Sequence, residues 1–319
     1  MIDIGNIEIQ DLFVGSANAV GLYQGDVEVW SKDTPPNPLT VVKYKAASGL
    51  DDWEDDIVGD LHGGVDMWHR PQPTAQIPNV LSADSVEIGT HVTSVGQVAF
   101  INCTNISEVT IPDSVLSIGL SAFVGCRGLT SITMGDGVTS IGNYAFLSCT
   151  NLSEITIPDS VTSLGTATFR GCSGLTNVTI GNGLTSIGSS AFDGCSGLTS
   201  VHITDIAKWC GISFGSLDAN PLYYAHNLYC NGVKVTDLVV PDSVTSIGNG
   251  AFYFCSGLTS VTIGDSVTSI GKNAFTNCTN LTSVTFVGKD MATVQGMSDY
   301  KWGLKTGCVL HCTDGDITI

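Results

Sequence analysis

The stretch SGLTSVTIGDSVTSIGKNAFTNC, residues 256–278, decides the fold of this chain. Its first half alternates apolar and polar residues, as a half-buried strand does, and then reaches the turn pair Gly264–Asp265. A second, shorter apolar pair follows and predicts a short strand on the opposite side. The apolar positions are, in order, Leu258, Val261, Ile263, Val267, Ile270, Ala274 and Phe275.

The same pattern returns along the chain at a fixed period, and cysteine marks it. Each of seven cysteines stands three residues after a phenylalanine. A fixed period of about 20 to 50 residues is the signature of a solenoid. These cysteines are Cys103, Cys126, Cys149, Cys172 and Cys195, and, after an interruption, Cys255 and Cys278.

The strand spacing L-x-x-L-x-L is typical of a leucine-rich repeat. We therefore predict a right-handed, β-rich leucine-rich repeat solenoid with short parallel strands and 23-residue turns, capped at both ends. One turn cannot bury its apolar face alone, so stacked turns should share ladders. The phenylalanines form one predicted ladder, and the other consists of Ile118, Ile141, Leu164, Ile187, Ile247 and Ile270.

Interruptions of the period divide the chain. Glycine-punctuated alternation predicts a small β-hairpin module over 1–30, with short runs at 7–9, 17–19 and 27–29. TVVKYKA, residues 40–46, predicts a strand. Asp290 predicts a helix cap for 291–297, and Asp314–Gly315 predicts a hairpin. The divisions are the module 1–30, a Pro-rich linker 31–38, an N-terminal cap 39–85, the array 86–288 with a 37-residue turn at 196–232, and a C-terminal cap 289–319.

Composition excludes several classes of partner. The formal net charge is −18, and the 12 Lys and Arg residues form no basic cluster. Nucleic acids and anionic membrane surfaces reward clustered cations, so neither is an expected partner. No apolar run predicts membrane insertion or a signal peptide. Composition alone therefore leaves the cellular compartment open.

The seven periodic cysteines predict buried thiols rather than disulfides. Side chains in register on stacked strands lie about 4.8 Å apart, whereas bridged Cβ atoms lie about 3.8 Å apart. The state of Cys210, Cys230, Cys308 and Cys312, which stand off the period, is left open.

The turns resemble the BspA-like family of bacterial leucine-rich repeats. The residues that carry the resemblance are V-T-S-I-G-x-x-A-F-x-x-C followed by L-T-S-V-T-I-P-D-S, over about residues 86–288. The long turn at 196–232 also resembles an insert seen in that family. The resemblance implies a surface-exposed bacterial protein that adheres to host matrix or to other cells by binding proteins, without catalytic residues. The termini resemble, more weakly, modules of prophage tail-like proteins. Together the two resemblances imply a cell-surface, extracellular or virion-associated protein.

The outward strand positions are the candidate binding face, because solenoids commonly bind through such a surface. The alternative is that Ser and Thr are simply soluble strand residues. A threonine rank could order water on ice, but curvature and the interruption at His202 and Val239 argue against it. The candidates on this face are Glu154, Asn177, His202 and Asp237.

Aromatic residues in the long turn are the second group of candidates. Rigid aromatic side chains are favoured in recognition, and a ring can stack on a sugar. The alternative is that they pack the extra loop on itself. The candidates are Trp209, Tyr223 and Tyr224, and we expect Phe214 and Tyr229 to lie outside the ladders with them.

We predict no catalytic, metal or cofactor site. No P-loop, G-x-S-x-G or H-E-x-x-H motif is present. His62, Asp66 and His69 stand in a poor helix, and strand alternation separates His311 from Cys308 and Cys312. The aspartates that recur in the turns, such as Asp113 and Asp159, are most simply turn formers, with calcium binding as the alternative.

These observations predict a non-enzymatic recognition or adhesion protein. Its expected partner is a host or bacterial surface protein or glycan, bound through the solenoid face. The alternative is a structural or receptor-binding component of a phage tail-like particle that contacts tail proteins through residues 1–30. A hydrolase with an unfamiliar site is a third, weaker interpretation.

Overall fold

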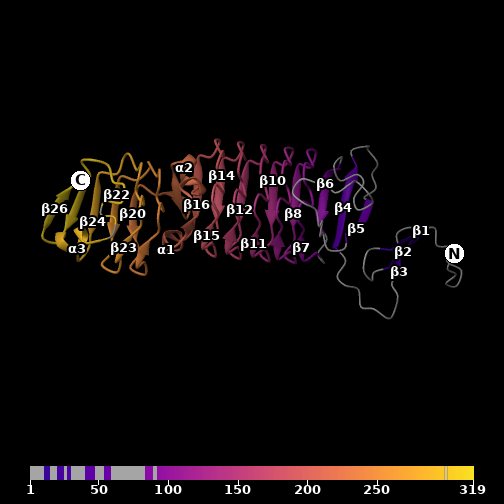
Figure 1. Ribbon diagram of the computed structural model, residues 1–319, viewed down its shortest axis with the longest axis horizontal. Coiled ribbons are helices and arrows are strands. Elements are labelled where there is room, and N and C mark those ends of the chain that lie inside the picture. Colours follow the sequence, from indigo (N-terminus) through magenta and orange to yellow (C-terminus); the bar gives the residue numbers. More distant parts are fainter. Residues whose placement is uncertain are drawn as a thin grey trace.

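The computed structural model describes residues 11–14, 20–24, 27–29, 40–46, 54–58, 83–88, 92–297, 299 and 301–319. The elements from β6 to β26 follow one another along the long axis of the molecule, as Figure 1 shows. Each turn of the chain contributes one longer strand and one short strand. Within each sheet the neighbouring longer strands of the array pair in parallel, most of them one repeat period apart, as β12 and β14 do through Glu154 and Asn177. This confirms the predicted leucine-rich repeat solenoid.

The longer strands form sheets whose side chains alternate between core and solvent. In β12 the second and fourth residues are buried and the other two are exposed, because successive strand residues point to opposite faces. The strands are β6 (Ala83–Ile88), β8 (Glu108–Ile111), β10 (Ser131–Met134), β12 (Glu154–Ile157), β14 (Asn177–Ile180), β16 (Ser200–Ile203), β18 (Leu228–Cys230), β20 (Asp237–Val240), β22 (Ser260–Ile263) and β24 (Ser283–Phe286).

The short strands form a second ladder. Ile118, Ile141 and Leu164 pair side by side in it, as predicted. The glycine that follows each short strand allows close stacking: a Cβ on Gly165 would lie 2.4 Å from the backbone nitrogen of Asn143 in the turn before. The strands are β7 (Ser94–Val95), β9 (Ser117–Ile118), β11 (Ser140–Ile141), β13 (Ser163–Leu164), β15 (Ser186–Ile187), β17 (Ser213–Phe214), β21 (Ser246–Ile247) and β23 (Ser269–Ile270).

The phenylalanines stack into a buried column. The ring centroids of Phe123 and Phe146 lie 5.1 Å apart, and those of Phe146 and Phe169 lie 5.3 Å apart. All seven periodic cysteines are free and buried, as predicted. The thiol of Cys149 donates a hydrogen bond to the carbonyl of Phe123 in the preceding turn, and Cys172 does the same to Phe146. Cysteine is therefore small enough for the core and also links neighbouring turns.

Both ends of the described array carry antiparallel strands. β4 (Thr40–Ala46), the predicted strand, pairs with β6 and with β5 (Glu54–Val58). Because much of 39–85 lies outside the described residues, its capping role stays a prediction. A separate antiparallel sheet consists of β1 (Asp11–Val14), β2 (Val20–Gln24) and β3 (Val27–Val29). The predicted runs at 7–9 and 17–19 lie outside the described residues.

The C-terminal segment has the predicted local structure. Asp290 accepts a hydrogen bond from the Thr293 amide, 2.8 Å away, and caps the helix α3 (Met291–Gln295). The hairpin of β25 (Val309–Cys312) and β26 (Gly315–Thr318) turns at Asp314–Gly315, and β25 pairs in parallel with β24. The last described strand of the array is thus covered by a hairpin and a helix.

The long turn interrupts both ladders, which corrects the prediction of a continuous ladder from Ile187 to Ile247. Phe214 of β17, not Ile247, pairs with Ile187, and β21 begins a separate two-stranded sheet. We call the segment between β16 and β20 the insert. Besides β17 and β18 it contains α1 (Ile206–Cys210), η2 (Leu217–Ala219), α2 (Leu222–Ala225) and β19 (Val233–Lys234). β19 pairs with β18 as a hairpin. This hairpin ends one sheet, and β20 begins the next.

Side chains bridge this interruption. In the regular turns, a backbone N–H donates a hydrogen bond to a carbonyl of the next turn, as the Phe169 amide does to the Ala191 carbonyl at 2.8 Å. At the break the equivalent acceptor, the carbonyl of Ala251, receives the Trp209 indole at 2.9 Å and the Asn220 amide at 3.2 Å. Two buried polar side chains therefore replace backbone donors that the insert no longer supplies.

Candidate binding surface

The candidate surface consists of the outward side chains of β12, β14, β16 and β18, which we call the sheet face. The strand register arranges them in two rows across the sheet. Pairing in register places side chains of equivalent positions next to one another on one face. The first row is Glu154, Asn177 and Ser200, and the second is Thr156, Thr179, His202 and Tyr229.

Hydrogen bonds order the end of the sheet face nearest the insert. The Ser200 hydroxyl donates to the Asn177 side-chain carbonyl and lies 2.9 Å from Nε2 of His202. Ser200 is only 7% exposed because these neighbours cover it. The predicted residues Glu154, Asn177 and His202 are thus brought together on adjacent strands.

Tyr229 completes this end of the face. Its ring stacks on the His202 ring, with centroids 4.9 Å apart and an angle of 19° between the planes. Tyr229 lies outside the two core ladders, as expected, but β18 pairs with β16 across an interval longer than the repeat period and so places Tyr229 beside His202. The period alone therefore gave no signal of this neighbour.

Asp237 lies on a different sheet, in β20. Its carboxylate accepts hydrogen bonds from the hydroxyls of Ser260 at 2.6 Å and of Thr259 and Thr236, both at 3.1 Å. These hydrogen bonds lower the pKa of Asp237, and the bond from Ser260 has the largest effect. The carboxylate therefore stays ionised in mildly acidic solution. Asp237 belongs to the sheet that begins at β20, whereas the sheet face ends at the β18–β19 hairpin.

Trp209 lies in the core, which removes it from the candidate surface. It is 1% exposed and packs edge-on against Phe214, with centroids 5.6 Å apart. The physical reason is that α1 turns its buried side toward the interruption, where the indole N–H finds the Ala251 carbonyl. The alternative interpretation, that aromatics of the insert pack the insert itself, applies to the contact between Trp209 and Phe214. Phe214 also continues the short-strand ladder beside Ile187, which corrects the expectation that it lies outside the ladders.

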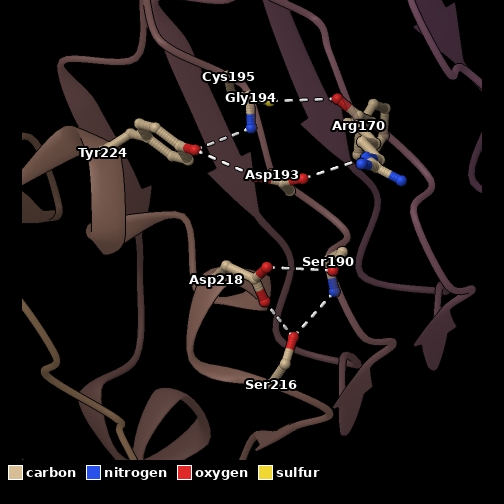
Figure 2. Close-up of polar contacts among 9 residues, drawn as sticks. Arg170, Ser190, Asp193, Gly194, Cys195, Ser216, Asp218 and Tyr224 are labelled. Carbon is tan, nitrogen blue, oxygen red and sulfur yellow. Dashed lines mark hydrogen bonds and ion pairs between the residues drawn. The ribbon is translucent and has the colours of Figure 1, made fainter.

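Tyr223 and Tyr224 are half-buried on α2. The Tyr224 hydroxyl donates to Asp193 at 3.3 Å and accepts from the Gly194 amide at 2.9 Å, as Figure 2 shows. Asp193 also pairs with Arg170 at 3.1 Å. Burial, and then the neighbouring Asp193 carboxylate, raise the pKa of Tyr224, which keeps the phenol protonated at physiological pH.

Sequence reasoning missed two aromatic residues beside Tyr223. Tyr253 and Phe254 lie in the turn that follows the insert, and both pack against the Tyr223 ring. Phe254 could have been found by aligning the turns in the sequence, because it is the one aromatic residue at its position in the aligned turns. The equivalent positions hold only glycine, asparagine or serine: Asn102, Gly125, Ser148, Gly171, Gly194 and Asn277.

Among the described residues, no three His, Cys, Asp or Glu side chains gather as a metal-binding group. His62, Asp66 and His69 lie outside them. Asp113 and Asp159 each accept a hydrogen bond from a backbone N–H of the next turn, at 2.9 and 2.7 Å. This is the predicted turn chemistry. In the described part of the chain, no helix is both long and apolar enough to cross a membrane.

Comparison with known proteins agrees with this architecture. The family model of the BspA type leucine rich repeat region matches in 6 copies, over residues 79–214 and 224–297. No curated protein matches the chain. The following solved structures are similar to it.

A leucine-rich repeat protein from Bacteroides ovatus is 26% identical, with 88% of this chain and 71% of that chain covered and a TM-score of 0.45. A leucine-rich repeat protein from T. pallidum is 26% identical, with 62% and 83% covered and a TM-score of 0.37. A leucine-rich repeat protein from Bacteroides capillosus is 43% identical over 28% of this chain and 63% of that chain, with a TM-score of 0.26. Because the family model spans more than half of the residues, the chain belongs to the BspA-type leucine-rich repeat family.

Proposed function

We propose that this chain is a non-enzymatic recognition protein that binds a surface protein of a host or a neighbouring bacterium through the sheet face. Membership of a family of surface-associated binding repeats supports the general role. The single observation that favours this face is the ordered polar end with a ring stack, where Asn177, Ser200, His202 and Tyr229 hold one another in place. Side chains fixed before binding lose less entropy when a partner docks.

The shape and chemistry of the face suit a protein partner. Its rows present hydroxyl, amide and carboxylate groups from Thr156, Asn177 and Glu154 on a regular strand lattice. The stacked pair of His202 and Tyr229 adds one aromatic anchor at the border of these rows. Aromatic anchors surrounded by polar groups carry most of the binding energy in protein interfaces.

The arrangement offers little for catalysis. A nucleophile needs an activating base that is itself oriented by a third group. The Ser200 hydroxyl lies next to His202, but it is covered and its proton is donated to Asn177. We therefore assign recognition rather than turnover to these residues.

The particle-component alternative depends on residues 1–30. Only β1, β2 and β3 of that segment are described, and they form a sheet of their own. No observation on these strands favours a tail contact, so the resemblance of the termini to tail modules stays a prediction.

Binding of the full chain to immobilised extracellular-matrix proteins and to whole cells tests the proposal. The variants His202→Ala and Tyr229→Ala should each weaken binding at least tenfold, which corresponds to about 1.4 kcal/mol. Thr156→Lys should weaken it as well, by placing a long charged side chain in the second row.

Thr245→Lys is the matched control, because Thr245 is also an exposed threonine but precedes the short strand β21. It should bind like the unmodified chain. If His202→Ala, Tyr229→Ala and Thr156→Lys all bind like Thr245→Lys, the sheet face is not the binding surface.

A further inference from the structure

Five aromatic rings gather where the insert meets the next turn, and we call them the aromatic patch. Tyr223 stands at its centre: its ring centroid lies 4.9 Å from Tyr224, 6.0 Å from Tyr253 and 5.1 Å from Phe254. His226 adds a fifth ring, 5.6 Å from Phe254. None of the five residues is buried, unlike the phenylalanines of the core column. The patch is therefore a partly exposed aromatic surface made by two segments of the chain.

Phe254 occupies a position that disfavours it. Its backbone has φ of 62°, in the left-handed region where a bulky side chain is a genuine outlier. The repeat imposes this conformation, because the Phe254 amide donates to the Thr276 carbonyl as its counterparts do in other turns. Those counterparts are glycine, asparagine or serine, which tolerate the conformation better. Strained residues of this kind cluster at functional sites, although the tight repeat turns also hold Val98 and Tyr144 at φ of 54° and 58°.

Polar groups border the rings. The hydroxyls of Tyr223 and Tyr253 have no hydrogen-bond partner among the described residues. On the other side of Tyr223, Tyr224 leads to the Asp193 carboxylate and from there to Arg170, the sequence of contacts drawn in Figure 2. The surface thus passes from ring faces to hydroxyl, carboxylate and guanidinium groups over a few neighbouring residues.

This combination matches the two kinds of surface on a pyranose. The axial C–H groups of a sugar ring pack on an aromatic face, and its equatorial hydroxyls bond to carboxylate, guanidinium and phenol groups at the border of the ring. The chain carries a net charge of −18, and the Asp193 carboxylate lies beside Tyr224 of the patch, so an anionic polysaccharide would be repelled. The chemistry therefore favours an uncharged saccharide.

We infer that the aromatic patch is a binding site for a neutral oligosaccharide, with Tyr223, Tyr253 and Phe254 as the stacking platform. Asp193 and Arg170 would bond to the hydroxyls of the next sugar unit. This site is separate from the sheet face and does not depend on the function proposed for it.

Calorimetric titration of the full chain tests the inference. The probes are hexasaccharides of glucose, xylose, mannose and N-acetylglucosamine, with an oligogalacturonate as the anionic control. At least one neutral probe should bind at millimolar concentration or below, and the oligogalacturonate should not. Absence of binding to all four neutral probes overturns the inference, as does preferential binding of the anionic one.

The variant Phe254→Asn separates a ligand role from a structural one. Asparagine is the residue of two equivalent turns, so the melting temperature should be unchanged or higher while sugar affinity falls at least tenfold. Tyr253→Leu, which keeps an apolar side chain but removes the ring, should lower affinity similarly without loss of the far-ultraviolet circular dichroism of the fold. Unchanged affinity in both variants means that the rings only join the insert to the next turn.

Tyr144→Ala is the matched control, since Tyr144 is a half-buried tyrosine in a regular turn and alanine occupies the equivalent position at Ala167. It should bind sugar normally. The sheet-face variant Tyr229→Ala should also bind sugar normally, and Phe254→Asn should still bind the surface partner. These crossed results distinguish failure of this site from failure of the sheet face.

Discussion

Replacing Phe146 by leucine removes a ring from the middle of the buried column but keeps most of the apolar volume. Phe146 stacks on two neighbours, Phe123 at 5.1 Å and Phe169 at 5.3 Å, with interplanar angles of 6° and 4°. Stacked aromatic pairs contribute about 0.5–1.5 kcal/mol each beyond the area they bury. The variant should therefore lower the free energy of unfolding by about 1–3 kcal/mol through lost stacking.

Phe275 provides a matched position. It is equally buried, but it stacks on one phenylalanine, Phe252, at 5.5 Å. Phe275→Leu should cost about 0.5–1.5 kcal/mol by the same reasoning. Full truncation, Phe146→Ala, should cost about 3–5 kcal/mol because a cavity is added.

Urea unfolding followed by far-ultraviolet circular dichroism measures these differences. Each turn of a solenoid contacts only its neighbours, so loss of one ring weakens two interfaces at an interior turn. If Phe146→Leu costs no more than Phe275→Leu, the stacked column does not couple the turns, and the reasoning fails.

Three further predictions concern the thiols and the interruption. Cys149→Ala should destabilise the fold more than Cys255→Ala does, by about 0.5–1.5 kcal/mol in denaturant unfolding. The reason is that the Cys149 thiol donates to the Phe123 carbonyl, while Cys255 donates to no carbonyl among the described residues. Equal costs would contradict a role for the thiol hydrogen bonds. Burial raises the pKa of Cys195, Cys210 and Cys255 from 9.0 to about 12. The folded state keeps protons that the unfolded chain releases, so stability should be level below pH 9 and fall steadily between pH 9 and 12; a level profile across that window, measured by unfolding at successive pH values, would refute this. Trp209→Phe removes the indole donor to Ala251 and should separate thermal unfolding into two steps, one for the turns before the interruption and one for those after it; a single unchanged calorimetric transition would show that the indole bond does not couple them.

The sequence alone determined the regular turns. Residues such as Phe146, Cys149 and Ile141 recur at the same spacing, and stacking in register is the arrangement that buries all of them together. The predicted strand at Thr40–Ala46, the Asp290 cap and the Asp314–Gly315 hairpin followed from local propensities that act within a few residues. The candidates Glu154, Asn177 and His202 were also within reach, because alternation in a strand decides which side chains face outward.

Only the tertiary structure decided what happens at the insert. The lengthened interval between His202 and Tyr229, the burial of Trp209 and the separate sheet that begins at β20 all depend on how α1, α2 and the β18–β19 hairpin pack. Periodicity carries no information where the period is broken, so the partners there are chosen by packing and by the need to satisfy buried polar groups such as the Ala251 carbonyl. The aromatic patch arises for the same reason: Tyr223 and Phe254 belong to different turns and meet only because the insert folds back on the next one.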